Sequence, residues 1–284
     1  MNHLSIILPA KNEAPALAEL LPRLRAAQPD AEIIVVDDGS TDDTCDVCAA
    51  AGAICLSSPY SMGNGAAIKR GARAASGEIL VFMDGDGQHD PADVARLLAT
   101  LEDGYDMAVG ARDWEGQAGM GRGIANTLYN WLATRMTGHR VLDLTSGFRA
   151  ARASKFREFL YLLPNGFSYP TTSTMAFFRS AYPVAYVPIR AAQRVGKSHI
   201  RPVKDGIRFL LIIFKIATLY SPLKLFVPAS LVFFLFGCAN YTWTFLHAGR
   251  LTNGSTLLWS AAVIVFLIGL VSEQITALMY RRDG

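Results

Sequence analysis

The sequence predicts an α/β protein with a mostly parallel sheet, helices on both faces of that sheet, and two membrane-spanning helices after it. Three observations lead to this prediction. Strand-like and helix-like patterns alternate through about the first 110 residues. The strand-like runs are continuously apolar, which is typical of strands buried on both faces. Two long runs without charge stand near the end of the chain.

The alternating elements can be placed by residue number. Strands are expected at 4–10, 31–37, 53–59, 78–83 and 105–112, and helices at 14–28, 41–52, 65–77 and 91–104. Pro22 is expected to disturb the middle of the first helix, because proline lacks the N–H that a helix needs.

The last third of the chain has a different composition. Residues 225–246 carry no charge, and 22 residues at about 1.5 Å each suffice to cross a bilayer core of about 30 Å. A second run, 256–272, is expected to continue to Tyr280. Before both, Arg208 and Lys215 share one face of an apolar helix. This pattern predicts a helix in the membrane interface, with an ordinary helix packed on the domain as the alternative.

We therefore expect four segments along the chain: a first domain at 1–205, a juxtamembrane helix at 206–221, and transmembrane helices at 222–246 and 256–280. Basic residues gather outside the two uncharged runs, whereas the connection between the runs holds one arginine. The positive-inside rule then places the first domain in the cytoplasm of a multi-pass cell-membrane protein. "MNHLSIILPA" does not read as a signal peptide.

Composition also excludes some classes of function. The net charge of +3 is too small to indicate nucleic-acid binding. Cys45 and Cys48 form a CxxC pattern, but no second pair completes a zinc site. All four cysteines are therefore expected to be ordinary thiols of a reducing compartment.

Polar motifs follow the predicted strands at the points where they end. "PAKNE" follows the first strand, "DDGS" the second, "DGDGQ" the fourth, and "GAR" ends the fifth. In parallel sheets, ligands bind beyond the carboxyl ends of the strands. The sequence therefore predicts one binding site at this edge.

The motif "DGDGQHDP" predicts a divalent metal site. Asp84, Asp86 and Gln88 carry oxygen ligands at alternating positions, which suit Mg²⁺ or Mn²⁺. A calcium EF-hand loop is excluded, because His89 stands where that loop needs glycine and Ala95 where it needs glutamate.

A glycine-containing loop, "GNGAAIKRG", precedes the third helix. Ile68 stands where a dinucleotide fingerprint needs glycine or alanine, so that reading is excluded. Lys69 is either a donor to a phosphate or a solvated charge.

The ordered motifs "PAKNE", "VVDDGSTD", "GNGAAIKRG", "DGDGQHDP", "GAR", "DLTSGFRA" and "RVGKS" resemble those of family 2 inverting glycosyltransferases. Among these, the chain is similar to dolichyl- or polyprenyl-phosphate sugar synthases over residues 3–200. The resemblance implies a GT-A fold and Mg²⁺ or Mn²⁺ as cofactor. It also implies a hexosyltransferase that moves one sugar from a nucleotide-diphosphate sugar to polyprenyl or dolichyl phosphate.

The resemblance also implies roles for individual residues. Those implied for nucleotide-sugar binding are Pro9, Asn12, Glu13, Asp37, Asp38, Lys69, Asp84, Gly85, Arg194 and Ser198. Those implied for catalysis are Asp86, Arg112, Arg122 and Asp143, and those for the acceptor phosphate are Arg112, Arg122 and Arg149. For Arg112 and Arg122, plain surface arginines are the alternative.

Two features bear on the chemistry. The acceptor that the resemblance implies is a phosphate monoester, which is mostly dianionic at neutral pH, so Asp143 is expected to orient groups more than to abstract a proton. Mannosyl-transferring relatives often carry an acidic residue in the segment that corresponds to "GFSYPTTSTMAF", and none occurs here. The sugar and the nucleotide, GDP or UDP, therefore stay open.

The expected partners are the sugar donor, the lipid phosphate and membrane lipid; a homo-oligomer remains open. The sequence leaves two alternative functions. A processive polysaccharide synthase would normally show a QxxRW motif and more spans. A non-catalytic, nucleotide-sugar-binding membrane scaffold would not need the metal motif and the paired arginines.

Overall fold

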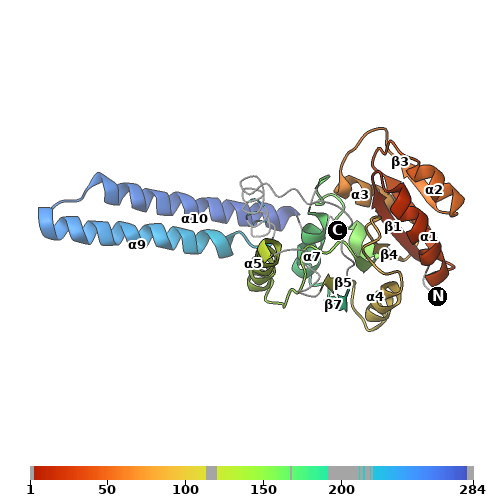
Figure 1. Cartoon of the computed structure of the whole chain (residues 1–284). Coiled ribbons are helices and arrows are strands. Elements are labelled where there is room, and N and C mark those ends of the chain that lie inside the picture. The colour runs from red at the N-terminus through yellow and green to blue at the C-terminus, as the bar shows by residue number, and fades with distance from the viewer. Residues whose placement is uncertain are drawn as a thin grey trace. The chain divides into compact units, whose positions relative to one another are not determined.

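A computed structural model describes residues 3–112, 120–166, 168–190, 211, 214, 218 and 220–279, with the backbone alone at 120–126. The chain forms two compact units that divide between residues 209 and 210 (Figure 1).

The first unit is built on a seven-stranded sheet of order β3-β2-β1-β4-β6-β5-β7. Its strands are β1 Leu4–Ala10, β2 Glu32–Asp37, β3 Ile54–Ser57, β4 Ile79–Phe82, β5 Met107–Arg112, β6 Arg149–Arg152 and β7 Val184–Ile189. β6 runs antiparallel to both β4 and β5, and the other pairs are parallel. The mostly parallel α/β sheet is confirmed, whereas the antiparallel β6 was not expected.

Helices cover both faces of the sheet, as predicted. They are α1 Ala14–Ala27, α2 Thr44–Ala50, α3 Asn64–Ala74, α4 Asp93–Glu102, α5 Met120–Thr137, α6 Ala153–Arg157 and α7 Tyr169–Arg179. Successive strand residues point to opposite faces. Ile6 therefore packs with Leu17 of α1 and Leu97 of α4 in one core cluster. Ile7 faces α3, where a Cβ on Gly71 would lie 2.4 Å from its Cγ2.

Two local expectations need correction. Pro22 lies inside α1, and the helix continues through it. Pro22 is exposed, whereas its neighbours Leu21 and Leu24 are buried on the apolar face of the helix. Packing of that apolar face offsets the lost backbone hydrogen bond. Cys45 is bonded to Cys55 with a Cα–Cα distance of 5.7 Å, so these two are not free thiols. Cys48 of the CxxC pattern points into the core instead.

The antiparallel β6 determines where the site can form. An antiparallel strand begins at the edge where its parallel neighbours end. The segment before β6, which contains "DLTSGF", is therefore delivered to the same edge as the loops that follow β4 and β5.

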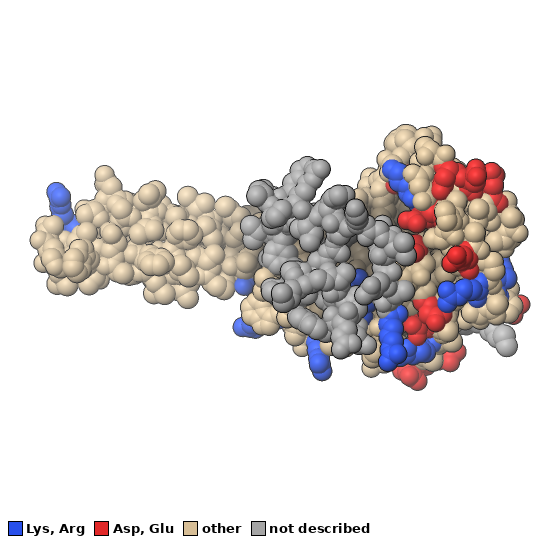
Figure 2. Space-filling model, viewed as in Figure 1, with Lys and Arg blue, Asp and Glu red and all other residues tan. Residues whose placement is uncertain are grey.

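The second unit is a hairpin of two helices, α9 Leu223–Ala248 and α10 Asn253–Met279. Both are long and apolar enough to cross a membrane, with mean hydropathies of 1.7 and 2.2. Figure 2 shows hardly any charge along this hairpin. The helices approach closely at Gly237 and Gly269, where an added Cβ would lie 2.5 Å from Trp259 and Phe226 respectively.

Glu273 of α10 binds the start of α9. Its Oε2 accepts hydrogen bonds from Ser221 Oγ and from the Leu223 N–H, each at 3.2 Å. This carboxylate therefore satisfies an N–H group at a helix start, which has no partner within its own helix. Most of the predicted juxtamembrane helix at 206–221 lies outside the described residues, and residues 211, 214, 218 and 220 are helical.

Candidate active site

The candidate site lies at the carboxyl edge of the first unit's sheet. Asp37 ends β2, Asp84 follows β4, and Arg112 ends β5. Asp143 lies in the loop before β6. The predicted convergence of motifs is therefore present, and β6 adds its loop to it.

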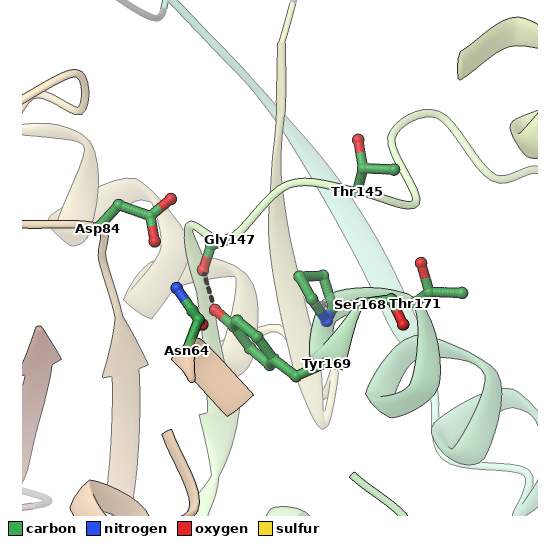
Figure 3. Close-up of a pocket in the computed structure, with 8 residues that line it drawn as sticks. Asn64, Asp84, Thr145, Gly147, Ser168, Tyr169 and Thr171 are labelled. Carbon is green, nitrogen blue, oxygen red and sulfur yellow. Dashed lines mark hydrogen bonds between the residues drawn. The ribbon is translucent and has the colours of Figure 1, made fainter. Parts of the chain in front are cut away.

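Asp84 lines a pocket at this edge, with a volume of about 80 Å³. The other lining residues are Asn64, Thr145, Gly147, Ser168, Tyr169, Pro170 and Thr171. Figure 3 shows Asp84 and Asn64 on one side, with Thr145 and Thr171 on the other. The Tyr169 hydroxyl donates to the Gly147 carbonyl at 2.9 Å, which fixes the start of α7 against the segment before β6 (Figure 3).

The Asp84 carboxylate fits tightly against Gly147. A Cβ built on Gly147 would lie 2.8 Å from Asp84 Oδ2. The backbone of Gly147 thus leaves a space that the carboxylate uses and that a larger residue would fill.

The three predicted metal ligands lie in one short turn. The Gln88 N–H donates to Asp86 Oδ1 at 3.1 Å, and Gly87 adopts a φ of 73° that favours glycine. Two carboxylates and one amide oxygen fit a hard divalent ion that completes its shell with water and substrate oxygens. Among the described residues, no cluster of three His, Cys, Asp or Glu side chains could hold a metal alone. The Gln88 amide and the substrate would therefore have to contribute.

Arg112 is held by Asp143 through two parallel hydrogen bonds. Its Nε donates to Oδ2 at 2.8 Å and its Nη2 to Oδ1 at 3.1 Å. Nη2 also donates to Thr145 Oγ1 at 2.8 Å. Bidentate pairs of this kind fix the plane of the guanidinium.

Asp143 itself is inaccessible, with 1% of its side chain exposed. Its Oδ1 also accepts the N–H groups of Thr145 and Ser146, each at 3.1 Å. Burial alone would raise the pKa of Asp143, but the hydrogen bonds and charge of Arg112 outweigh it and lower that pKa. The residue is therefore an ionised anchor for Arg112, in agreement with an orienting role.

The pKa of Arg112 is correspondingly raised. Burial lowers it, but the hydrogen bonds and charge of Asp143 and the charge of Asp84 outweigh burial. About a quarter of the Arg112 side chain stays exposed, so a ligand can reach it.

Arg149 differs from its expected role at the acceptor phosphate. It is fully buried, and its Nη1 donates to Pro170 O at 2.9 Å, Ser173 Oγ at 2.9 Å and Thr174 Oγ1 at 3.0 Å. Its Nη2 donates to the Ser146 carbonyl. Desolvation lowers its pKa. Arg149 thus links the loop before β6 to α7, and no ligand can touch it in this arrangement.

Lys69 has protein partners in this structure. Its Nζ donates to the Leu163 carbonyl at 3.2 Å and to Asn165 Oδ1. The ammonium therefore joins α3 to the loop after α6, and it keeps a third donor, so its role toward a phosphate stays a prediction.

Asp37 and Asp38 are buried and hold loops. Asp37 accepts from the Ser40 N–H at 2.8 Å and from Ser57 Oγ at 2.7 Å. Asp38 accepts from the Met62 N–H at 2.6 Å and, through Oδ2, from the Gly63 N–H at 2.9 Å. Each carboxylate has further acceptor positions, so nucleotide binding by them stays a prediction.

The segment after β1 is tied to the loop after β2. Asn12, whose φ is 54°, accepts the Thr41 N–H at 2.8 Å and donates its own N–H to Ser40 Oγ at 2.9 Å. Pro9 lies in β1, and its carbonyl accepts the Gly85 N–H at 3.4 Å. Glu13 immediately precedes α1. Pro9, Asn12, Glu13 and Gly85 are thus brought to the predicted edge.

Some site residues were not found from the sequence. Asn64, Thr145 and the stretch Ser168–Thr171 line the pocket. The sequence signal for this part of the pocket is the hydroxyl-rich run "SYPTTST", which contains no acid. Of the predicted residues, Arg194 and Ser198 lie outside the described residues, as does the Arg122 side chain.

Comparison with protein families agrees with this geometry. A family described as glycosyl transferase family 2 matches residues 5–160. The chain belongs to glycosyl transferase family 2. The hairpin of this family 2 protein also matches a family, described as the GtrB C-terminal hairpin, over residues 221–278. Both the predicted family and the predicted hairpin are therefore confirmed.

Related proteins match about half of the chain. The chain is 33% identical over 164 residues to undecaprenyl-phosphate 4-deoxy-4-formamido-L-arabinose transferase of Proteus mirabilis (strain HI4320), covering 54% of this chain and 49% of that protein. It is 35% identical over 161 residues to the transferase of that name from Serratia proteamaculans (strain 568), covering 52% and 48%. The chain thus spans about half the length of these relatives.

Solved structures confirm the GT-A-like fold of the family 2 chain. Glucosyl-3-phosphoglycerate synthase from Mycobacterium tuberculosis, in complex with Mn²⁺ and UDP-glucose, aligns with a TM-score of 0.62 at 23% identity. The alignment covers 76% of this chain and 78% of that one. The complex of that enzyme with Mn²⁺, UDP and glucosyl-3-phosphoglycerate gives a TM-score of 0.60 at 25% identity, over 76% and 78%.

Proposed function

We propose that this family 2 glycosyltransferase moves one sugar from a nucleotide-diphosphate sugar to polyprenyl phosphate. The observation that carries the proposal is the placement of Asp84 and the Asp143-held Arg112 at one edge, in a chain that also carries an apolar hairpin. The relatives named as undecaprenyl-phosphate sugar transferases support the same acceptor.

The donor would bind along the strand ends. Asp37 and Asp38 with Asn12 and Glu13 face the nucleoside, and Asp84, Asp86 and Gln88 hold the divalent ion. That ion, when bound, offsets charge on the diphosphate leaving group. The structural relatives contain Mn²⁺, which agrees with these three metal ligands, and Mg²⁺ is the alternative. The pocket beside Asp84 then receives the sugar.

The acceptor phosphate would be held by Arg112, with Arg122 as its predicted partner. Asp143 keeps the Arg112 guanidinium charged and fixed in plane. A phosphate oxygen forms the new bond to the anomeric carbon while the bond from that carbon to the diphosphate breaks. The anomeric centre is inverted in this single displacement, and no proton need be removed from a dianionic acceptor.

The hairpin anchors the enzyme. α9 and α10 would cross the cell membrane, with the first unit and the chain's last residues on the cytoplasmic side, as the distribution of basic residues predicts. In this proposal, residues 1–205 form the first domain and residues 206–221 form the juxtamembrane helix. Anchoring keeps the site at the surface where the lipid phosphate lies.

The sugar need not be a hexose. The named relatives transfer an arabinose derivative, which is a pentose. The pocket wall formed by Ser168–Thr171 offers hydroxyl groups and no acid, which distinguishes it from the corresponding segment of mannosyl-transferring relatives. We therefore leave the hexosyl assignment to experiment.

A panel of donors tests the proposal. Purified full-length protein is incubated with Mg²⁺ or Mn²⁺, undecaprenyl phosphate and, in separate reactions, GDP-mannose, UDP-glucose and UDP-4-deoxy-4-formamido-L-arabinose. Mass spectrometry should find a lipid-phosphate sugar with one donor, and Asp86→Asn should abolish it. Donor turnover that never yields a lipid product would contradict the proposal.

A further inference from the structure

We infer that the Cys45–Cys55 pair is a thiol–disulfide switch that sets the affinity of the first unit for its nucleotide. The bonded form holds the loop at 38–43 in its binding arrangement, and the reduced form lets that loop open. The inference rests on the proposed nucleotide-sugar binding and on the proposed cytoplasmic side of the first unit. Disulfides of cytoplasmic proteins are usually transient and catalytic or redox-sensing.

The disulfide joins two short elements at one edge of the sheet. α2 has seven residues, with Thr44 and Cys48 buried, and a helix of this length is marginal without packing. β3 has four residues and lies at the sheet edge, in contact with α2 (Figure 1). The bond joins positions ten residues apart, and so it limits how far α2 can separate from β3.

Both halves of the pair border Asp37, which is predicted to bind the nucleoside. Cys45 Sγ lies 3.9 Å from Asp37 Oδ2. On the other side, Ser57 stands two residues after Cys55 and donates its hydroxyl to the same Oδ2 at 2.7 Å. Ser57 also lies opposite Asp37 in the β2–β3 register. The disulfide therefore fixes the spacing of the two elements between which this carboxylate lies.

The loop that leads into α2 also holds the segment after β1. Asn12 Oδ1 accepts the Thr41 N–H at 2.8 Å, and the Asn12 N–H donates to Ser40 Oγ at 2.9 Å. Cys45 follows this loop as the second residue of α2. A shift of α2 would therefore move the partners of Asn12 and the surroundings of Asp37 together, and both residues are predicted to bind the nucleoside.

The pair is open to exchange with an external thiol, and the neighbouring cysteine does not compete. Cys45 and Cys55 are each partly exposed, so a reductant can reach their sulfur atoms. Cys48, one turn after Cys45, is buried. Burial, with the charge of Asp37, raises the pKa of Cys48 to about 11, so it stays a thiol at neutral pH and does not attack the bond.

The reductant in this exchange is a dithiol. Its first thiolate attacks one sulfur of the pair and forms a mixed disulfide while the Cys45–Cys55 bond breaks, and its second thiol then displaces the protein sulfur. Two protein thiols and one oxidised dithiol result, so two electrons and two protons pass to the protein. An oxidised dithiol restores the bond by the reverse steps.

Nucleotide binding to the two redox forms tests the inference. Full-length protein carries Cys238→Ser, which removes the thiol of α9 and leaves the Cys45–Cys55 pair in place. One portion is treated with oxidised glutathione and another with dithiothreitol, and each is titrated calorimetrically with UDP and with GDP in the presence of Mg²⁺. For the nucleotide that binds, reduction should raise the Kd by roughly five- to tenfold, because binding must then close a loop that the disulfide otherwise holds closed.

A double variant serves as the matched control. Cys45→Ser with Cys55→Ser should bind as weakly as the reduced protein, whether or not oxidant is added. Equal Kd values for the oxidised and reduced forms of the parent would overturn the inference and leave the proposed function standing. Oxidised protein in which Cys45 and Cys55 do not pair, as peptide mass spectrometry would show, would also overturn it. Absence of nucleotide binding in both forms would overturn the proposed function as well.

Hydrogen exchange tests the loop without any nucleotide. Amides at 38–50 should exchange faster in the reduced protein, whereas those of Ile7 in β1 and Val81 in β4 should exchange equally in both forms. Unchanged exchange at 38–50 would mean that the loop does not depend on the bond. Faster exchange throughout the first unit would mean that the bond only stabilises the domain. Either result would overturn the inference.

Discussion

Asp143 and Arg112 form a bidentate ion pair in which Asp143 Oδ2 accepts Nε at 2.8 Å and Oδ1 accepts Nη2 at 3.1 Å. The carboxylate is buried and the guanidinium is partly exposed. Only the arginine can therefore touch a substrate, and the aspartate acts through it.

In Asp143→Asn, Arg112 should lose its ionised partner, and its guanidinium should no longer be held in one orientation. We expect the acceptor KM to rise and kcat to fall by about 10- to 100-fold, because one charge-assisted pair of about 1.5–3 kcal/mol is lost. The pH dependence of kcat should keep its shape, since no proton is removed by Asp143. Steady-state kinetics between pH 6 and 9 would check this, and the loss of an acidic limb in the variant would instead identify Asp143 as a general base.

Asp143 should also affect stability in acid. Its pKa is lowered in the folded protein, so its contribution is present above the unfolded pKa of about 3.9 and is lost as pH falls through the lower folded value. The wild-type free energy of unfolding should therefore drop below about pH 4 more steeply than that of Asp143→Asn. Urea titrations in detergent at pH 3 to 6 would measure the difference, and parallel curves would refute it.

Gly147→Ala should weaken metal binding without unfolding the protein. The new Cβ would lie 2.8 Å from Asp84 Oδ2, so the carboxylate must move. Displacement of one ligand should lower Mn²⁺ affinity by roughly tenfold, the scale of changes around metal ligands. Electron paramagnetic resonance titration of Mn²⁺ with nucleotide diphosphate would measure this. Gly166→Ala is the control, because nothing lies within 4 Å of its added Cβ, and equal affinities in both variants would contradict the assignment of Asp84.

Arg149→Met should destabilise the first unit rather than abolish acceptor binding. The substitution leaves the carbonyls of Ser146 and Pro170 without a charged donor, and we expect a loss of about 2–4 kcal/mol. Denaturant titration would measure that loss. In the folded enzyme at low temperature the acceptor KM should stay within about threefold of the wild-type value, and a much larger rise with normal stability would restore Arg149 to the acceptor site.

The sequence predicted the edge of the sheet well because strand ends are a local property. Each motif follows an apolar run, and parallel strands bring their ends together whatever the helices between them do. Asp37, Asp84 and Arg112 can therefore be grouped from the sequence alone. The pairing of Arg112 with Asp143 could not be read from spacing, because β6 inserts antiparallel between β4 and β5.

Arg149 shows where motif reading fails. It is a cation next to site residues in the sequence, and a distant partner, Ser173 on α7, holds it inside the fold. The Cys45–Cys55 bond was missed because all four cysteines were expected to be thiols of a reducing compartment. Burial is decided by tertiary packing, which a single sequence does not display.

Analysis of the lipid product tests the central claim most directly. With its preferred donor, the full-length enzyme should yield undecaprenyl phosphate carrying one sugar, and should release one nucleoside diphosphate for each lipid product, as mass spectrometry and a coupled nucleotide assay would show. A polymer of several sugars on the lipid, or free sugar released without any glycosylated lipid, would contradict the claim.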